Sequence, residues 1–263
     1  MKDIAQLRDK RGVVIQKVGI KDLHIPLQIR RKENGYQQVL GNVDMAVELP
    51  HGYRGTHLSR MVEIIFKWSR QPLGGKDIRA ILMQMRKRLD AEHAHITVRF
   101  KYFIEKVAPV SKSRSALDYG CEFTGVHSDE GFDFILGVEV PVTSLCPCSK
   151  EISERGAHNQ RAMIRARIRY EQDVFYWIED LVEQLEQLPS SDIFPMLKRA
   201  DEKYVTEKAY DNPKFVEDIL RDAVVMFRGN PAIRWFEIEI ESLESIHNHS
   251  AYAYQQEWLE KDP

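Results

Sequence analysis

Two cysteines and a histidine fall within one short polar segment, from Pro141 to Arg161. Cys146 and Cys148 stand on either side of Pro147, and His158 follows in the sequence Gly-Ala-His-Asn-Gln. Thiolate and imidazole are the ligands that suit Zn²⁺ and neighbouring first-row metals. The segment shows no clean hydrophobic periodicity, so we predict an irregular functional loop that holds a metal ion.

The cysteines and His158 do not make a complete structural zinc site. The sequence has no Cys-x₂₋₄-Cys pair that would complete such a site, and His247-Asn248-His249 offers two further histidines. Glu202 and Glu244 are candidate carboxylate ligands. Three protein ligands with one open position are typical of a catalytic metal site. A buried cysteine pair and a redox dithiol remain alternatives for Cys-x-Cys.

Composition excludes several classes of protein. The chain has 263 residues, of which 30% are charged and 43% hydrophobic, and its formal net charge is −2. This near-neutral charge argues against a nucleic-acid partner, which would require a basic surface. We also expect no membrane partner, because no apolar run reaches membrane-spanning length and the N-terminus has no signal-peptide core. Three cysteines, an odd number, argue against a disulfide framework and favour a cytoplasmic location.

Hydrophobic patterning predicts an α+β fold in which similar elements occur twice. In the first half, we expect strands near 13–29 and 37–49, helices over 58–68 and 78–89, and strands near 96–102, 116–124 and 132–142. In the second half, a strand over 164–170 precedes a helix with Val174 and Ile178 on its apolar stripe. The pair Asn212-Pro213 has the residue types of a helix start, with Asn as N-cap. The last predicted strand covers 236–241.

Two of the predicted strands carry opposite charges at alternate positions. One presents three arginines and the other three glutamates: Arg165, Arg167, Arg169, and Glu237, Glu239, Glu241. Alternate residues of a strand point to the same face, so these side chains would face one another if the strands pair. We predict that the two strands are neighbours; the alternative is that each charged face is simply solvated.

Several motifs in the same order resemble the prokaryotic GTP cyclohydrolase type IB enzymes. The motifs are SLCPCSKEIS with GAHNQR, LKRADEKYVTEKAYDNPKFVED (Leu197 to Asp218), ESIHNHSAYAY (Glu244 to Tyr254), VGIKDL, GTHLSR and the stretch from Ala108 to Tyr119. One departure is Ala200, where the family usually has Pro. The resemblance implies a doubled tunnelling fold of two β-β-α-α-β-β-like units, with antiparallel sheets and helices on one face. We place these halves at 1–142 and 143–263, in a homotetramer with active sites between subunits.

The resemblance also implies a reaction and a set of metal ligands. GTP would be converted to 7,8-dihydroneopterin triphosphate and formate, the first step toward tetrahydrofolate and the deazaguanine base of tRNA. Zn²⁺ or Mn²⁺, with Fe²⁺ as a further candidate, would be bound by Cys146, His158 and Glu202, with His247 as a fourth ligand or a proton donor. Cys148 would face the substrate, although spacing alone leaves the roles of the two cysteines interchangeable.

The remaining site residues follow from the same matched motifs. Glu244, His247 and His249 form the candidate acid–base group. Glu217 would bind guanine through its carboxylate, whereas sequence alone would explain it as a favourable charge at a helix N-terminus. Arg60, Lys112 and Arg114 would bind the triphosphate, with Lys198, Arg199 and Lys203 as alternatives. No Walker-type phosphate loop occurs, which excludes that class of nucleotidase.

Other functions remain as alternatives. One is a different tunnelling-fold enzyme acting on a purine or pterin. A zinc deaminase is a weaker alternative, because such enzymes carry Pro-Cys-x-x-Cys and this chain has Cys-Pro-Cys. A non-catalytic protein that binds a metal or a nucleotide is the alternative from another class, and for it Cys148 and His249 would be dispensable.

Overall fold

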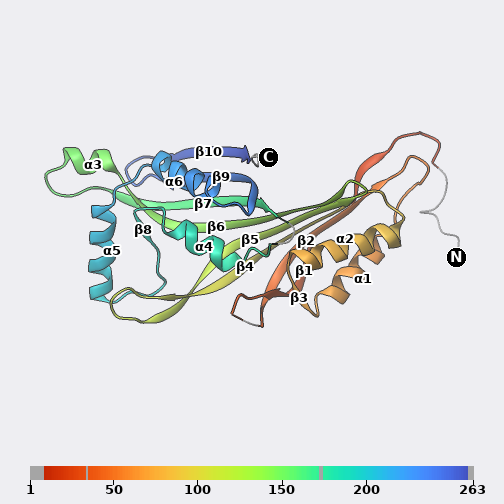
Figure 1. The fold of residues 1–263 in the computed structure, drawn as a ribbon, viewed down its shortest axis with the longest axis horizontal. Helices are drawn as coiled ribbons and strands as arrows, with labels where there is room; N and C mark the ends of the chain where they lie inside the picture. The colour runs from red at the N-terminus through yellow and green to blue at the C-terminus, as the bar shows by residue number, and fades with distance from the viewer. Residues whose placement is uncertain (1–8, 34, 172–173, 260–263) are drawn as a thin grey trace. The chain divides into compact units, whose positions relative to one another are not determined.

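The computed structural model describes residues 9–33, 35–171 and 174–259, which form an α+β fold (Figure 1). In chain order the elements are β1 (Ile15–Arg30), β2 (Tyr36–Leu49), α1 (Leu58–Trp68), β3 (Pro72–Leu73), α2 (Gly75–Leu89), β4 (Ala94–Val107), β5 (Arg114–Ser128), β6 (Gly131–Leu145), α3 (Pro147–Ile152), β7 (Asn159–Tyr170), α4 (Ile178–Glu186), β8 (Ser191–Asp192), α5 (Arg199–Asp211), α6 (Val216–Arg228), β9 (Ile233–Leu243) and β10 (Ser250–Trp258). In the part of the chain so described, every helix is too short or too polar to serve as a transmembrane span.

The chain divides into two compact units that are interleaved in the sequence. The first comprises Met1–Lys101 with Glu122–Leu136, and the second Tyr102–Cys121 with Gly137–Pro263. Strands β4, β5 and β6 each pass from one unit into the other. These units are defined by compactness, whereas the predicted tunnelling-fold halves at 1–142 and 143–263 are defined by the repetition of similar elements. The two halves therefore remain a prediction.

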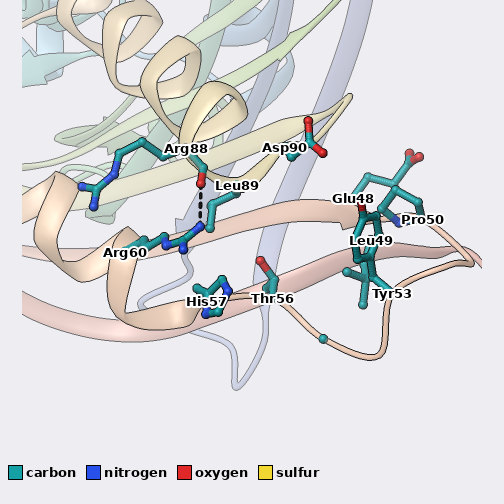
Figure 2. A pocket seen from close by; sticks show the side chains of 11 residues that line it. Glu48, Leu49, Pro50, Tyr53, Thr56, His57, Arg60, Arg88, Leu89 and Asp90 are labelled. Atoms are coloured by element: carbon teal, nitrogen blue, oxygen red, sulfur yellow. Dashed lines mark hydrogen bonds between the residues drawn. The ribbon is translucent and has the colours of Figure 1, made fainter. Parts of the chain in front are cut away.

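In the first unit, helices α1 and α2 pack on one face of long antiparallel strands. Strand β2 pairs antiparallel with β1 and β4, and the short β3 pairs parallel with β1. Alternate strand residues are buried and meet the apolar faces of the helices, as the period of two in a strand predicts. The buried side chains are Leu27, Ile29, Val43, Met45, Val47, Ile96 and Val98 from the strands, and Met61, Ile65, Ile78, Ile81 and Leu82 from the helices. The two helices are also joined by a hydrogen bond of 2.9 Å from the Arg60 guanidinium to the carbonyl oxygen of Arg88 (Figure 2).

In the second unit, β9 pairs antiparallel with both β7 and β10. The buried face of these strands carries Ala162, Ile164, Ala166, Ile168, Ile238 and Ile240. Helix α6 covers this apolar face, and its Phe227 ring lies 5.1 Å from the ring of Phe236 in β9. The hydrophobic core of the unit therefore lies between the strands and the helices.

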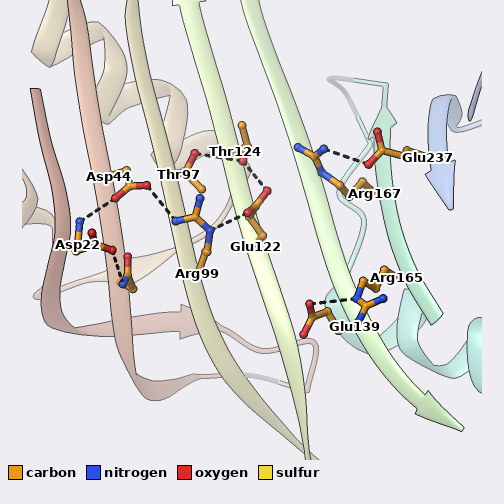
Figure 3. Close-up of polar contacts among 11 residues, drawn as sticks. Asp22, Asp44, Thr97, Arg99, Glu122, Thr124, Glu139, Arg165, Arg167 and Glu237 are labelled. Carbon is orange, nitrogen blue, oxygen red and sulfur yellow. Dashed lines mark hydrogen bonds and ion pairs between the residues drawn. The ribbon is translucent and has the colours of Figure 1, made fainter. Parts of the chain in front are cut away.

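The opposite face of β7 and β9 carries the predicted charge ladder, and the pairing of these two strands is confirmed. Arg165 lies opposite Glu239 and Arg167 opposite Glu237 in the register. The Arg165 guanidinium lies 2.5 Å from Glu239 and 2.9 Å from Glu241. The Arg167 guanidinium lies 3.2 Å from Glu237 (Figure 3).

The first unit carries a similar row of polar side chains across neighbouring strands. Arg99 of β4 lies 3.0 Å from Asp44 of β2 and 3.2 Å from Glu122 of β5 (Figure 3). These residues alternate along their strands with the buried side chains of Val43 and Val98. The same period of two therefore separates an apolar face from a charged face in both units.

Two predicted helix starts were wrong. Helix α4 begins at Ile178 rather than near Val174. Helix α6 begins at Val216 with Phe215 as N-cap, not at Asn212-Pro213. Asn212 instead ends α5, and its side-chain amide donates to the carbonyl oxygen of Pro189 at 3.0 Å. The Asp218 carboxylate accepts the N–H of Phe215 at 3.1 Å, so an acidic residue at the third position fixes the start of α6.

Candidate active site

The cysteine segment is more regular than the sequence predicted. Strand β6 continues to Leu145, and a short helix, α3, occupies Pro147–Ile152, so the prediction of an irregular loop was wrong over these residues. Cys146 is the N-cap of α3, and its sulfur accepts the N–H of Ser149 at 3.4 Å. Pro147 takes the first helical position, where its missing N–H costs nothing. Cys146 is half-buried and Cys148 is exposed.

Two hydrogen bonds hold His158 beside the cysteine turn. The amide of Cys146 donates to the carbonyl oxygen of His158 at 3.1 Å. The amide of His158 donates to the hydroxyl oxygen of Ser149, also at 3.1 Å. The structure therefore brings together Cys146 and His158, the two predicted ligands closest in sequence.

A chain of side chains extends from His158 to the segment after β9. Nδ1 of His158 lies 2.9 Å from Oε1 of Gln160, and Nε2 of Gln160 donates to Oε1 of Glu244 at 3.1 Å. The hydroxyl of Ser245 lies 3.5 Å from the same Nδ1. The predicted acid–base residue Glu244 thus joins the cysteine–histidine region. Sequence reasoning missed Gln160, because a glutamine at the start of a strand carries no signal of its own.

The two histidines after Glu244 lie side by side. The rings of His247 and His249 are stacked, with centroids 5.0 Å apart and an angle of 11° between their planes. In an extended segment, side chains two residues apart point to one face. The backbone of 244–249 turns instead of extending, but the two rings are adjacent.

Glu202 does not join this group within one chain. It is exposed near the start of α5. The other end of α5 contacts the cysteine helix, because Nζ of Lys150 in α3 donates to the carbonyl oxygen of Tyr210 at 2.5 Å and lies 4.2 Å from its ring centroid. At a rise of 1.5 Å per residue, Glu202 and Tyr210 are about 12 Å apart along the helix axis. Within residues 9–33, 35–171 and 174–259, the structure contains no group of three or more His, Cys, Asp and Glu side chains placed to hold a metal ion.

The start of α5 is bound to the loop that carries two predicted triphosphate ligands. Asp201, next to Glu202, is completely buried. Its Oδ1 accepts the N–H groups of Val110 and Ser111, each at 2.8 Å, and its Oδ2 accepts the N–H of Lys198 at 2.9 Å. Burial opposes ionisation, but these hydrogen bonds outweigh it and lower the pKa of the Asp201 carboxyl well below its ordinary value. Sequence analysis did not single out Asp201, and the structure shows that it anchors this loop.

Lys112 and Arg114 lie on the loop that Asp201 holds, and both are exposed. Lys112 has a left-handed backbone with φ of 57°, and its ammonium donates to the carbonyl oxygen of Pro109 at 2.8 Å. The Arg114 guanidinium lies 3.0 Å from the Glu105 carboxylate. These two cations therefore lie close to the start of α5, where Glu202 is found.

Glu217 and Arg60 lie apart from these groups. Glu217 is exposed in the first turn of α6. Arg60 belongs to the first compact unit, where it lines a hollow of about 180 Å³ together with His57, Glu48 and Asp90 (Figure 2). Two carboxylates in that lining make it less suited to a triphosphate than a purely cationic pocket.

Comparison with known proteins identifies the family. A family model described as type I GTP cyclohydrolase folE2 matches residues 1–253. The chain belongs to this family. A relative named GTP cyclohydrolase FolE2 from Geobacter sulfurreducens is 52% identical over 253 residues, covering 96% of each chain. A relative of the same name from Geotalea uraniireducens is 49% identical, covering 96% of this chain and 92% of its own. The resemblance drawn from the motifs is thus confirmed, and the chain is an enzyme of a family that implies a divalent metal.

Solved structures support the fold. A uricase from Arthrobacter globiformis matches with a TM-score of 0.53 at 9% identity, covering 94% of each chain. A hyper-thermostable uricase variant matches with a TM-score of 0.55 at 8% identity, covering 93% of this chain and 92% of that one. At such low identity the likeness concerns the fold alone. It confirms the predicted tunnelling-fold architecture.

Proposed function

We propose that this FolE2-family chain converts GTP to 7,8-dihydroneopterin triphosphate and formate, the step that begins tetrahydrofolate synthesis. The observation that carries the proposal is the hydrogen bond of 3.1 Å that joins Cys146 to His158. This backbone bond sets Cys146 next to His158, whose imidazole contacts the Gln160–Glu244 pair, in a chain that matches GTP cyclohydrolase relatives over nearly its whole length.

The proposed metal ligands are Cys146, His158 and Glu202, with His247 as a fourth ligand or a neighbouring proton donor. Sulfur, nitrogen and oxygen donors together fit Zn²⁺ or Mn²⁺. A divalent ion bound there would lower the pKa of its water and supply hydroxide for attack on C8 of guanine. Cys146 is suited to the role because its sulfur lies at the start of α3, where it accepts a backbone N–H.

The proton transfers are assigned to Glu244, His247 and His249. Opening the imidazole ring of guanine and closing a pterin ring require protons at several atoms, and imidazole titrates near neutral pH. The stacked arrangement of His247 and His249 allows both rings to reach one substrate. Cys148, exposed in the first turn of α3, is assigned to contact with the substrate.

For substrate binding we propose that Glu217 accepts hydrogen bonds from the guanine N1–H and 2-amino group, since a carboxylate has two acceptor oxygens for two donors. Lys112 and Arg114 would bind the triphosphate, and their position near the start of α5 supports this assignment. Arg60 is the weakest of the three candidates, because its guanidinium already donates to the carbonyl oxygen of Arg88.

We further propose a homo-oligomer, a tetramer by family resemblance, in which a second copy of the chain supplies Glu202 to the site. The length of α5 between Glu202 and the contact with α3 supports this arrangement. Three cysteines present as thiols fit a reducing compartment such as the cytoplasm.

A direct assay tests the function. Purified protein loaded with Zn²⁺ or Mn²⁺ is incubated with GTP, and formate release and pterin absorbance are followed together. We expect both products in equal amounts, and we expect a chelator to abolish the activity until metal is restored. Purine deamination without formate would indicate another enzyme. Metal-loaded, folded protein that binds GTP but forms no product would indicate a binding protein.

A further inference from the structure

The side-chain amide of Gln160 lies between a proposed metal ligand and a proposed acid–base residue. Its Oε1 is 2.9 Å from Nδ1 of His158, and its Nε2 is 3.1 Å from Oε1 of Glu244. Gln160 is half-buried near the start of β7. The antiparallel register of β7 and β9 ends with Ala162 opposite Ser242, and Gln160 and Glu244 each lie two residues beyond this last pair. The paired strands therefore bring the two side chains close to one another.

The chemistry of the three groups decides which atom carries each proton. A carboxylate only accepts hydrogen bonds, so Glu244 must face the NH₂ end of the amide. The carbonyl oxygen of Gln160 then faces His158, and because that oxygen also only accepts, Nδ1 of His158 must carry the hydrogen. Nε2 of His158 is left with its lone pair, which is the state that binds a metal.

We propose that Gln160 is a positioning residue that acts on both neighbours. With its carbonyl oxygen it holds His158 as the Nδ1–H tautomer with Nε2 available to the metal, and with its NH₂ group it fixes the orientation of the Glu244 carboxylate. The metal-binding part of this inference depends on the proposed function. The tautomer part depends only on the two hydrogen bonds.

The tautomer is tested in metal-free protein by ¹⁵N NMR of labelled histidine, with His158→Asn to assign the signals. We expect the Nδ1–H form in the wild type and a shift toward the Nε2–H form in Gln160→Leu, which removes both hydrogen bonds. Gln187→Leu, at an exposed position at the end of α4, is the matched control and should leave the His158 signals unchanged.

Metal affinity gives the second readout. In titrations of Co²⁺ and Zn²⁺ against a competing chelator, Gln160→Leu should weaken binding by about 10- to 100-fold, the usual effect of losing such a supporting hydrogen bond. Gln160→Glu keeps an acceptor for Nδ1 but sets a second carboxylate against Glu244. It should therefore hold metal within a few-fold of the wild type yet show a reduced kcat.

The proposal is overturned if folded Gln160→Leu keeps both the Nδ1–H signal and the wild-type metal affinity. If that variant fails to fold, Gln160→Glu provides the test. Equal losses of metal affinity and kcat in Gln160→Glu would contradict the proposal that Gln160 acts separately on His158 and on Glu244. Wild-type protein with the expected tautomer and metal affinity but no activity on GTP would refute the proposed function and leave this inference standing.

Discussion

Cys146 and Cys148 have different surroundings although one residue separates them. The sulfur of Cys146 is half-buried at the start of α3 and accepts the N–H of Ser149, whereas Cys148 is exposed. The backbone of Cys146 is also bonded to that of His158. A hydrogen bond to the sulfur of a ligand holds that sulfur in a fixed orientation, which supports metal binding. These differences favour Cys146 as the ligand, a choice that spacing alone left open.

Single substitutions separate the two roles. We expect Cys146→Ser to weaken metal binding by about 100-fold or more, because an oxygen donor replaces the thiolate. By family resemblance, Cys148 would meet the substrate as a thiolate or a proton donor. Cys148→Ser should therefore keep metal affinity within a few-fold but lower kcat by about 10²- to 10⁴-fold, the usual range for loss of a group that transfers a proton. Chelator competition measures the first quantity and formate release the second. The opposite pattern would assign the metal to Cys148.

At the scale of secondary structure, the charge ladder between β7 and β9 makes a modest contribution to stability. The side chain of Arg165 is 39% exposed and those of Glu239 and Glu241 are 31% and 33% exposed. Solvent screens such partly exposed pairs, so each is worth less than its short distance suggests. Glu139 of β6 lies 3.8 Å from the same guanidinium (Figure 3). A network of one guanidinium and three carboxylates still contributes more than an isolated pair.

Arg165→Met tests this contribution, because it keeps the apolar stem and removes the charge. We expect the free energy of unfolding to fall by about 1 kcal/mol at low salt. The difference in free energy of unfolding between the wild type and Arg165→Met should be smaller at 1 M NaCl, where the Debye length is about 3 Å. Arg234→Met is the control, since that guanidinium is 52% exposed and lies 3.9 Å from Glu171. An effect of Arg165→Met that does not depend on salt would show that packing, not charge, is responsible.

Helix α5 and the 108–114 loop are coupled through the buried Asp201. The pKa of this carboxyl is lowered in the folded protein by hydrogen bonds from Ser111, Lys198 and Val110 that exceed the cost of burial. A lowered folded-state pKa means that the contribution to stability is present above the unfolded pKa, near 4. The contribution is then lost as the pH falls below that value.

The contribution is lost completely only below the much lower folded-state pKa, so Asp201→Asn should destabilise the protein most at pH 7 and less at pH 3. In the variant an NH₂ group would oppose the N–H of Lys198, so one hydrogen bond becomes a clash of donors. Urea unfolding midpoints of both proteins between pH 7 and pH 3 measure the difference. Asp211→Asn, at the end of the same helix, is the control. If the difference in urea unfolding midpoint between Asp201→Asn and the wild type stays constant over this pH range, the carboxylate does not stabilise the protein in the way proposed.

Sequence patterns predicted the elements whose hydrophobic period is strong and missed those whose pattern is weak. The alternation in β7 and β9 predicted both strands and their pairing. Helix α5 has no apolar stripe and buries only Asp201 and Ala209 among its residues, so periodicity could not reveal it. Strand β10 was missed because the Asn-His-Ser-Ala-Tyr run is mixed in polarity. The contact of Gln160 with Glu244 joins residues far apart in sequence, and only the strand register brings them together.

At the scale of the whole molecule, the proposed metal ligands do not all come together in one chain. Cys146 and His158 are adjacent, but Glu202 lies toward the opposite end of α5 from the helix that Cys146 caps. Sequence motifs supplied all three residues, but they could not show that one copy of the chain fails to bring them together. Closed symmetric oligomers are the common way for identical chains to share residues across an interface.

Mixing two inactive variants tests whether the site is shared. Cys146→Ala removes the thiolate and Glu202→Gln the carboxylate, and each variant alone should have little activity. If each site takes Cys146 from one copy and Glu202 from another, random mixed oligomers should contain about a quarter wild-type sites, because each contributor is intact half of the time. Unfolding and refolding the two variants together should then restore about a quarter of the wild-type rate of formate release. Refolding each variant by itself provides the baseline. If both residues came from the same copy, every site would lack one of them, and mixed refolding would restore no activity.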